Sequence, residues 1–158
     1  MKRWSSLQRE LYMLIDERAD FQIHLSRYRM DSQHGSTDLP RYWITVGGEI
    51  VFDYPKDFTD SENRGNAVKD LNGRVSYYPY ETDISDISRF IREYIDTPKD
   101  ELFSKRFESD CWGLADIFRA ADKRIGKRRL EQFGQSTHSK AALRIIEQRL
   151  ANYEEEHK

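Results

Sequence analysis

The chain has 158 residues, of which 37% are hydrophobic and 13% aromatic, and its 26 basic and 28 acidic residues give a net charge of −2. This length suits one domain with one core, and the balanced charge excludes a global field that would attract nucleic acid or an anionic membrane. The single cysteine, Cys111, excludes an internal disulfide framework. Because no apolar run reaches membrane-spanning length and no signal-peptide pattern opens the chain, we expect a cytoplasmic protein.

The first 30 residues predict a helix followed by a strand. Ser5 or Ser6 can cap the helix, which should end between residues 16 and 20. Its apolar residues recur at helical spacing and are Leu7, Leu11, Leu14 and Ile15. Apolar and polar residues then alternate from Phe21 to Leu25, which is the period of a strand with one buried face.

Turn-forming residues dominate the segment from Asp31 to Pro40, which predicts a loop. His34 lies between Asp31 and Asp38, and His24 belongs to the preceding strand. If these groups converge on a cleft, the Asp31–Asp38 segment could form a polar site of an enzyme. The alternative is a water-exposed loop, which is a common fate for this composition.

The segment from Arg41 to Tyr54 predicts a β-hairpin, because aromatic and β-branched residues flank Gly47 and Gly48. Two glycines permit the positive φ of a two-residue turn. The expected register pairs Val46 with Glu49, Thr45 with Ile50, Ile44 with Val51, and Trp43 with Phe52. Both faces carry apolar side chains, so the sheet should be covered, at least in part, by helices. A second hairpin could turn at Asn72-Gly73.

From Thr82 onward the apolar residues follow the helical period, with Thr82 or Asp83 as the first cap. Thr97 and Pro98 have the residue types of an N-cap and a first helical position, and a further helix should begin after Ser109 or Asp110. We therefore predict an α+β fold with a small antiparallel sheet and a mainly helical C-terminal half. The expected organisation is one domain over residues 1–158, with a helix and the sheet in 1–80 and helices in 81–158.

Gly126 should end or bend that helix, because the apolar phase slips there. A short separate helix is expected after it, and residues 134–139 read as a linker. The last helix is outlined by residues that share one stripe, namely Ala142, Ile146, Arg149, Leu150 and Tyr153.

The only concentrated charge lies between Arg119 and Arg129, where Asp122 is the one acidic residue. Cations spread over about three helical turns could contact phosphates, which predicts a nucleic-acid site. Its candidate residues are Lys123, Arg124, Lys127, Arg128 and Arg129. The alternative is a solvated helix face, because basic residues near a helix C-terminus are favoured by its dipole.

Tyr77, Tyr78 and Tyr80 are candidates for a protein interface, since large amphipathic rings dominate such surfaces. The alternative is that these rings pack the sheet onto the following helix. The histidines do not have metal-ligand spacing, and no nucleophile motif or phosphate loop occurs. We therefore predict no catalytic residue, no metal and no cofactor.

Five short motifs between residues 41 and 130 resemble a family of small bacterial proteins of uncharacterised function. They are Arg-Tyr-Trp-Ile-Thr, Phe-Asp-Tyr-Pro, Thr-Asp-Ile-Ser-Asp-Ile, Ile-Arg-Glu-Tyr-Ile-Asp-Thr-Pro and Arg-Ile-Gly-Lys-Arg-Arg-Leu. The resemblance implies a bacterial, cytosolic origin and no particular activity. Our leading hypothesis is a non-catalytic protein-binding protein, for example an immunity-like or antitoxin-like one. Nucleic-acid binding through 119–129 and an enzyme with a site at Asp31–Asp38 are the alternatives.

Overall fold

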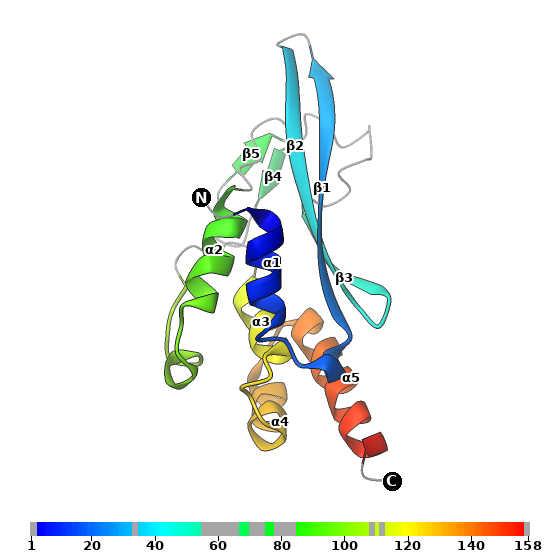
Figure 1. Ribbon diagram of the computed structural model, residues 1–158, viewed down its shortest axis with the longest axis vertical. Coiled ribbons are helices and arrows are strands. Elements are labelled where there is room, and N and C mark those ends of the chain that lie inside the picture. Colours follow the sequence, from blue (N-terminus) through cyan, green and yellow to red (C-terminus); the bar gives the residue numbers. More distant parts are fainter. Residues whose placement is uncertain are drawn as a thin grey trace.

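The computed structural model describes residues 3–32, 35–54, 67–69, 75–77, 85–107, 110 and 113–156. The fold is α+β, as predicted, and the C-terminal half is mainly helical (Figure 1). The helices are α1 (Trp4–Tyr12), α2 (Ser85–Ile95), α3 (Leu114–Ala121), α4 (Lys127–Ser136) and α5 (Lys140–Glu156), with short 3₁₀ turns η1 (Glu17–Ala19) and η3 (Lys99–Glu101). The strands are β1 (Phe21–Ser32), β2 (Gly35–Val46), β3 (Glu49–Tyr54), β4 (Ala67–Lys69) and β5 (Val75–Tyr77).

The main sheet is antiparallel with strand order β1-β2-β3. β4 and β5 form a separate antiparallel pair in which Lys69 faces Val75, and the turn predicted at Asn72-Gly73 lies outside the described residues. The far end of the β1-β2 hairpin extends beyond the helices, whereas its near end lies beside α3 and α5 (Figure 1). The sheet residues buried against the helices are Phe21, Ile23, Tyr42, Ile44 and Val46.

The Gly47-Gly48 turn is confirmed, with φ angles of 58° and 83°. Both values lie in the left-handed region, where glycine avoids the strain that a Cβ would cause. Val46 pairs with Glu49 and Thr45 with Ile50, as predicted. The predicted pairing of Ile44 with Val51 and Trp43 with Phe52 is wrong: the register shifts between Ile44 and Thr45, so that Ile44 faces Phe52 and Trp43 faces Asp53. This irregularity is a β-bulge, in which Val51 is the extra residue of β3 and has no partner in β2.

The loop predicted from Asp31 to Pro40 is wrong, because β1 and β2 continue through it as paired strands. Asp31 pairs with Ser36, and Asp38 pairs with Arg29. Backbone pairing with β1 therefore overrides the turn propensity of this polar segment. His34 lies outside the described residues.

Two helix boundaries differ from the predictions, because the side chains expected to cap these helices do not do so. α1 starts at Trp4 without a side-chain cap, so that Ser5 and Ser6 lie inside it. Instead of capping a new helix, Thr97 donates its hydroxyl hydrogen bond to the carbonyl of Glu93 at 2.8 Å and closes the end of α2. Only the single 3₁₀ turn η3 follows Pro98.

Around Gly126 the prediction of a separate helix is confirmed by α4. α3 nevertheless ends earlier than expected, at Ala121, because Asp122 has extended backbone angles and its carboxylate accepts a hydrogen bond from the Arg124 N–H at 2.8 Å. Asp110 does contribute to the start of α3, since its carboxylate accepts from the N–H groups of Leu114 and Ala115, both at 2.9 Å.

An aromatic cluster occupies the core between α2 and α3. The ring centroids of Phe90 and Phe118 lie 5.4 Å apart in a stacked arrangement, and Tyr94 meets Phe118 edge to face at 5.2 Å. Phe107 completes the cluster against Phe90. These rings bury large areas for their number, which offsets the low overall hydrophobic content of the chain.

Candidate functional site

A buried arginine on α5 joins segments that are distant in the sequence. Arg149 is 0% exposed, and its Nη2 donates to Asp16 Oδ2 at 3.0 Å. The same guanidinium donates to the carbonyls of Ala120 at 2.8 Å, Asp122 at 3.1 Å and Ile125 at 2.8 Å. Ala120 belongs to the last turn of α3, where carbonyls lack helical partners. Arg149 therefore caps α3 and neutralises Asp16 at the same time.

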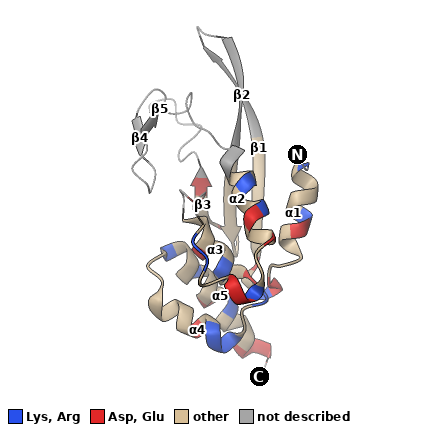
Figure 2. Ribbon diagram, turned by 90° about the vertical axis from the view of Figure 1, so that its left-hand side faces the viewer, with Lys and Arg blue, Asp and Glu red and all other residues tan. Residues whose placement is uncertain are grey.

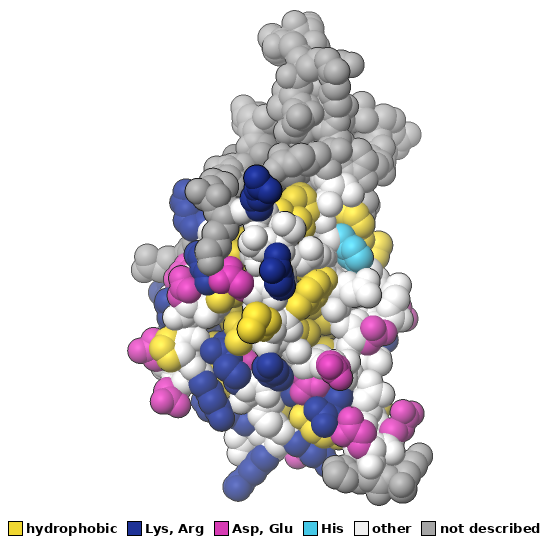
Figure 3. All heavy atoms as spheres, in the orientation of Figure 1, with side chains coloured by type: hydrophobic (Ala, Val, Ile, Leu, Met, Phe, Trp, Pro, Cys, Tyr) yellow, Lys and Arg dark blue, Asp and Glu magenta, His cyan; other side chains and the backbone are white. Residues whose placement is uncertain are grey.

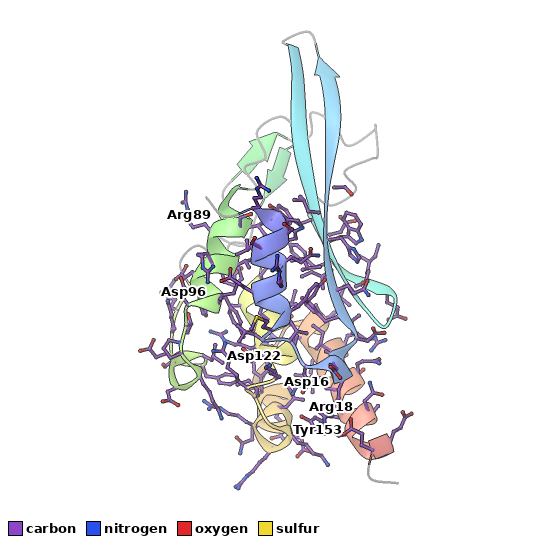
Figure 4. All side chains as sticks on the ribbon, in the orientation of Figure 1. Asp16, Arg18, Arg89, Asp96, Asp122 and Tyr153 are labelled. Atoms are coloured by element: carbon purple, nitrogen blue, oxygen red, sulfur yellow. The ribbon has the colours of Figure 1, made fainter. Side chains whose placement is uncertain are left out.

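A second set of contacts holds η1 against the end of α5. Arg18 donates to Glu156 at 2.8 Å, and its guanidinium lies 4.2 Å from the ring centroid of Tyr153. Asn152 donates to the carbonyl of Arg18 at 2.8 Å. Figure 4 shows Asp16, Arg18 and Tyr153 gathered at this junction. Charged and stacked groups together fix the position of η1.

Asp122 is the other buried carboxylate of this region. It is 0% exposed, and it accepts hydrogen bonds from Tyr94 Oη and from Arg124 Nη2, each at 2.7 Å. These bonds raise the pKa of the Arg124 guanidinium. Burial, reinforced by the negative charge of Asp122, raises the pKa of the Tyr94 hydroxyl well above its ordinary value of 10.0. The Arg124 side chain is therefore engaged with Asp122, and this contact fixes the turn after α3.

The raised pKa of Tyr94 predicts a loss of stability in alkali. Above about pH 10 the unfolded tyrosine releases its proton while the folded one keeps it, so that the free energy of unfolding falls by up to about 1.4 kcal/mol per pH unit. Tyr94→Phe removes this contribution. In urea titrations at about pH 8 and about pH 11, the stability difference between wild type and variant should shrink at the higher pH. A difference that is equal at the two pH values would contradict this reading.

An open groove of about 350 Å³ lies beside this network. Its lining residues come from the end of α1, from η1, from the turn after α3 and from α5, and are Tyr12, Met13, Ile15, Asp16, Glu17, Arg18, Lys123 and Glu156. A second depression of about 340 Å³ shares three of these residues and is lined also by Asn152 and Glu155. We call the two together the α1–α5 groove. Figure 3 shows acidic and basic side chains interspersed with apolar ones on the face that carries α1.

Two side chains at the rim of the α1–α5 groove expose apolar surface. Met13 is 65% exposed, and Tyr12 is 37% exposed. A hydrogen bond to the sheet holds the Tyr12 hydroxyl in place, because this oxygen accepts the Ile23 N–H at 2.9 Å. Glu17 and Glu155 are exposed, and no ion pair forms between them and any side chain of the described part of the chain. The groove thus combines an apolar rim with surplus negative charge.

One family model matches most of the chain. The model of the SF0329 protein family matches residues 3–150. The chain belongs to the SF0329 protein family. The family membership agrees with the resemblance noted in the sequence. No curated protein and no solved structure matches this SF0329 family member. Across the residues that the structure describes, no helix has the length and apolar character needed to span a membrane.

In this SF0329 family member the predicted basic site divides into half-buried arginines with internal partners and exposed cations. Arg124 is engaged with Asp122, and Arg119 donates to the carbonyl of Leu102 at 2.7 Å and to Asp116 at 2.8 Å. The remaining candidates are exposed and are Lys123, Lys127, Arg128 and Arg129. Figure 2 shows basic residues on α4, at the end of the molecule away from the long hairpin. Nucleic-acid binding by this segment stays a prediction, with fewer available cations than the sequence suggests.

The other predicted sites are only partly described. Tyr77 lies in β5 opposite Ala67, and Tyr78 and Tyr80 lie outside the described residues. His24 stacks on Trp43, with ring centroids 4.8 Å apart, and partial burial lowers the pKa of this histidine. Within the described ranges no group of three or more His, Cys, Asp or Glu residues is arranged to hold a metal ion. The enzyme hypothesis at Asp31–Asp38 stays an untested prediction.

Sequence reasoning missed the α1–α5 groove and the role of Arg149. The helical period does place Arg149 on the inward stripe of α5, and an arginine at such a position signals a buried partner. Asp16 lies 133 residues away in the chain, so the partner carries no local signal. Met13 was likewise not identified, because a single exposed methionine has no distinguishing pattern.

Proposed function

We propose that this protein is a non-catalytic binding protein that receives a partner protein in the α1–α5 groove. The observation that carries the proposal is the exposure of Met13, at 65%, on the rim of a charged groove. Methionine is enriched at protein interfaces because its flexible, polarizable side chain adapts to a partner. An immunity-like or antitoxin-like protein that covers a toxin is one concrete form of this function.

The charges of the α1–α5 groove indicate the charge that a partner segment should carry. Glu17 and Glu155 extend the negative surface, whereas Arg18 is already held by Glu156 and stacked on Tyr153. A complementary segment therefore carries an apolar side chain for Met13 and lysine or arginine for the glutamates. The contacts of Arg18 with Glu156 and Asn152 hold η1 on α5, and such fixed positions limit the entropy lost on binding.

A photo-crosslinking amino acid at position 13, expressed in the source cell, tests the proposal. The crosslinker should capture one protein in stoichiometric yield, and the same group at position 50 should not. Ile50 is the matched control because it is also apolar and exposed, at 57%, but belongs to β3. With the captured protein purified, Met13→Asp should weaken binding at least about tenfold and Ile50→Asp should not.

Charge reversal completes this test. Glu17→Lys together with Glu155→Lys should weaken binding and reduce its dependence on salt, because the partner would lose its acidic complement. Two results would reject the groove as the interface. One is equal capture from positions 13 and 50, and the other is unchanged affinity in Met13→Asp.

A further inference from the structure

A small pocket between η3 and α4 has a composition unlike that of the α1–α5 groove. It has a volume of about 160 Å³, opens to solvent, and is lined by Phe103, Arg129, Gln132, Phe133 and Ser136. The four α4 residues recur at positions i, i+3, i+4 and i+7, which places them on one face of the helix. Phe103 reaches this face from the segment after η3.

The pocket contains a preformed stack. The Arg129 guanidinium lies 4.5 Å from the ring centroid of Phe103. Phe103 in turn meets buried Phe133 edge to face, with centroids 5.2 Å apart and an angle of 68° between the planes. Phe133 thus supports the ring from the core, and Phe103 supports the planar guanidinium. Arg129 itself is exposed, so that a ligand can reach it from solvent.

Polar and basic groups surround this stack. The Gln132 amide can donate and accept hydrogen bonds, whereas the Ser136 hydroxyl donates to the carbonyl of Phe133 at 3.1 Å and can still accept a hydrogen bond. Arg128 and Lys127 are exposed in the first turn of α4, where Glu131 is the one acidic residue of the helix. α4 therefore carries a net positive charge next to a flat, partly aromatic surface. Figure 2 shows basic residues on this helix.

We propose that this pocket binds one nucleobase, carried either by a single strand of nucleic acid or by a free nucleotide. A base stacks on an arginine plane or an aromatic ring, and its polar edge can bond with an amide and a hydroxyl. A volume of about 160 Å³ accommodates a base and leaves its phosphates outside, where Arg128 and Lys127 supply positive charge. In a duplex the bases are already paired and stacked, so a duplex cannot fill the pocket. This site is separate from the α1–α5 groove and does not depend on the function proposed there.

Fluorescence anisotropy with a short labelled oligoadenylate at low salt tests the proposal. The wild type should bind, and Arg129→Lys should bind about tenfold more weakly, because lysine keeps the charge but loses the stacking plane. The matched control is Arg9→Lys, which makes the same exchange at an exposed position on α1. Phe103→Leu should weaken binding as well, and its thermal unfolding should be measured to show that it remains folded.

Competition distinguishes the source of the base. Unlabelled oligoadenylate or free adenosine monophosphate should displace the probe, and whichever competes better identifies a strand or a free nucleotide as the ligand. A duplex of the same length should not compete. The proposal is overturned if wild type fails to bind both adenine ligands, if Arg129→Lys and Arg9→Lys bind alike, or if the duplex competes as well as the single strand.

Discussion

Replacing Arg149 by methionine is expected to lower the free energy of unfolding by about 3–5 kcal/mol. Methionine retains much of the volume but removes the buried guanidinium that pairs with Asp16 and donates to three backbone carbonyls, and Asp16 keeps its contacts with Arg18. Buried acceptors left without donors carry their full desolvation penalty. Urea denaturation followed by circular dichroism measures the effect.

Arg144→Met is the matched control, because it removes another arginine from the same helix. Arg144 pairs with Glu49 at 2.9 Å, but both side chains reach solvent. Exposed pairs of this kind contribute about 0–1 kcal/mol. Arg149→Lys should also be strongly destabilising, since an ammonium group cannot reach acceptors spread around a planar fork. Equal losses in Arg149→Met and Arg144→Met would show that burial of the charge is not what stabilises α5.

Asp122→Ala should lower the free energy of unfolding by about 3 kcal/mol. The substitution removes the acceptor for Tyr94 and Arg124, leaving a buried hydroxyl and a half-buried guanidinium without their carboxylate. It also removes the bond that turns the chain after α3. Tyr94→Phe should cost less, about 1 kcal/mol, because Arg124 still holds the carboxylate.

Asp96→Ala is the control for this prediction. Asp96 also pairs with an arginine, Arg92, at 2.9 Å, but its side chain is 65% exposed. Its removal should change the free energy of unfolding by less than about 0.5 kcal/mol. The double variant Tyr94→Phe/Asp122→Ala should lose less than the sum of its parts, since the two groups share one hydrogen bond. Strict additivity would contradict the proposed coupling.

The sequence predicts well those elements whose signal is local. Ile87, Phe90, Ile91 and Tyr94 repeat at helical spacing, and all four are buried in α2. The Gly47-Gly48 turn was also predictable, because few residues other than glycine accept positive φ at both positions. Periodicity and backbone sterics act within a few residues, and a sequence displays them directly.

Features that depend on distant partners could not be predicted in the same way. No residue type in the sequence marks the register shift between Ile44 and Thr45, and the extension of β1 and β2 through Asp31 and Asp38 depends on their mutual pairing. The sequence also shows a run of cations around Arg124 without showing which are bonded internally. Charge counting therefore overestimated the basic surface, since it does not reveal hydrogen bonds to carboxylates and carbonyls.

The ion pair between Asp16 and Arg149 also bears on how the chain reaches its native state during synthesis. Until the ribosome has added Arg149, the Asp16 carboxylate has its contacts with nearby Arg18 but not its buried ion pair, and the carbonyls of Ala120, Asp122 and Ile125 lack the guanidinium that donates to them. α1 and the sheet can form earlier, but at that stage the contacts that anchor η1 to α5 are still missing. Closing a loop of this length is entropically unfavourable and tends to be slow. Completion of the core is thus a late, cooperative step that follows translation of nearly all of the described chain.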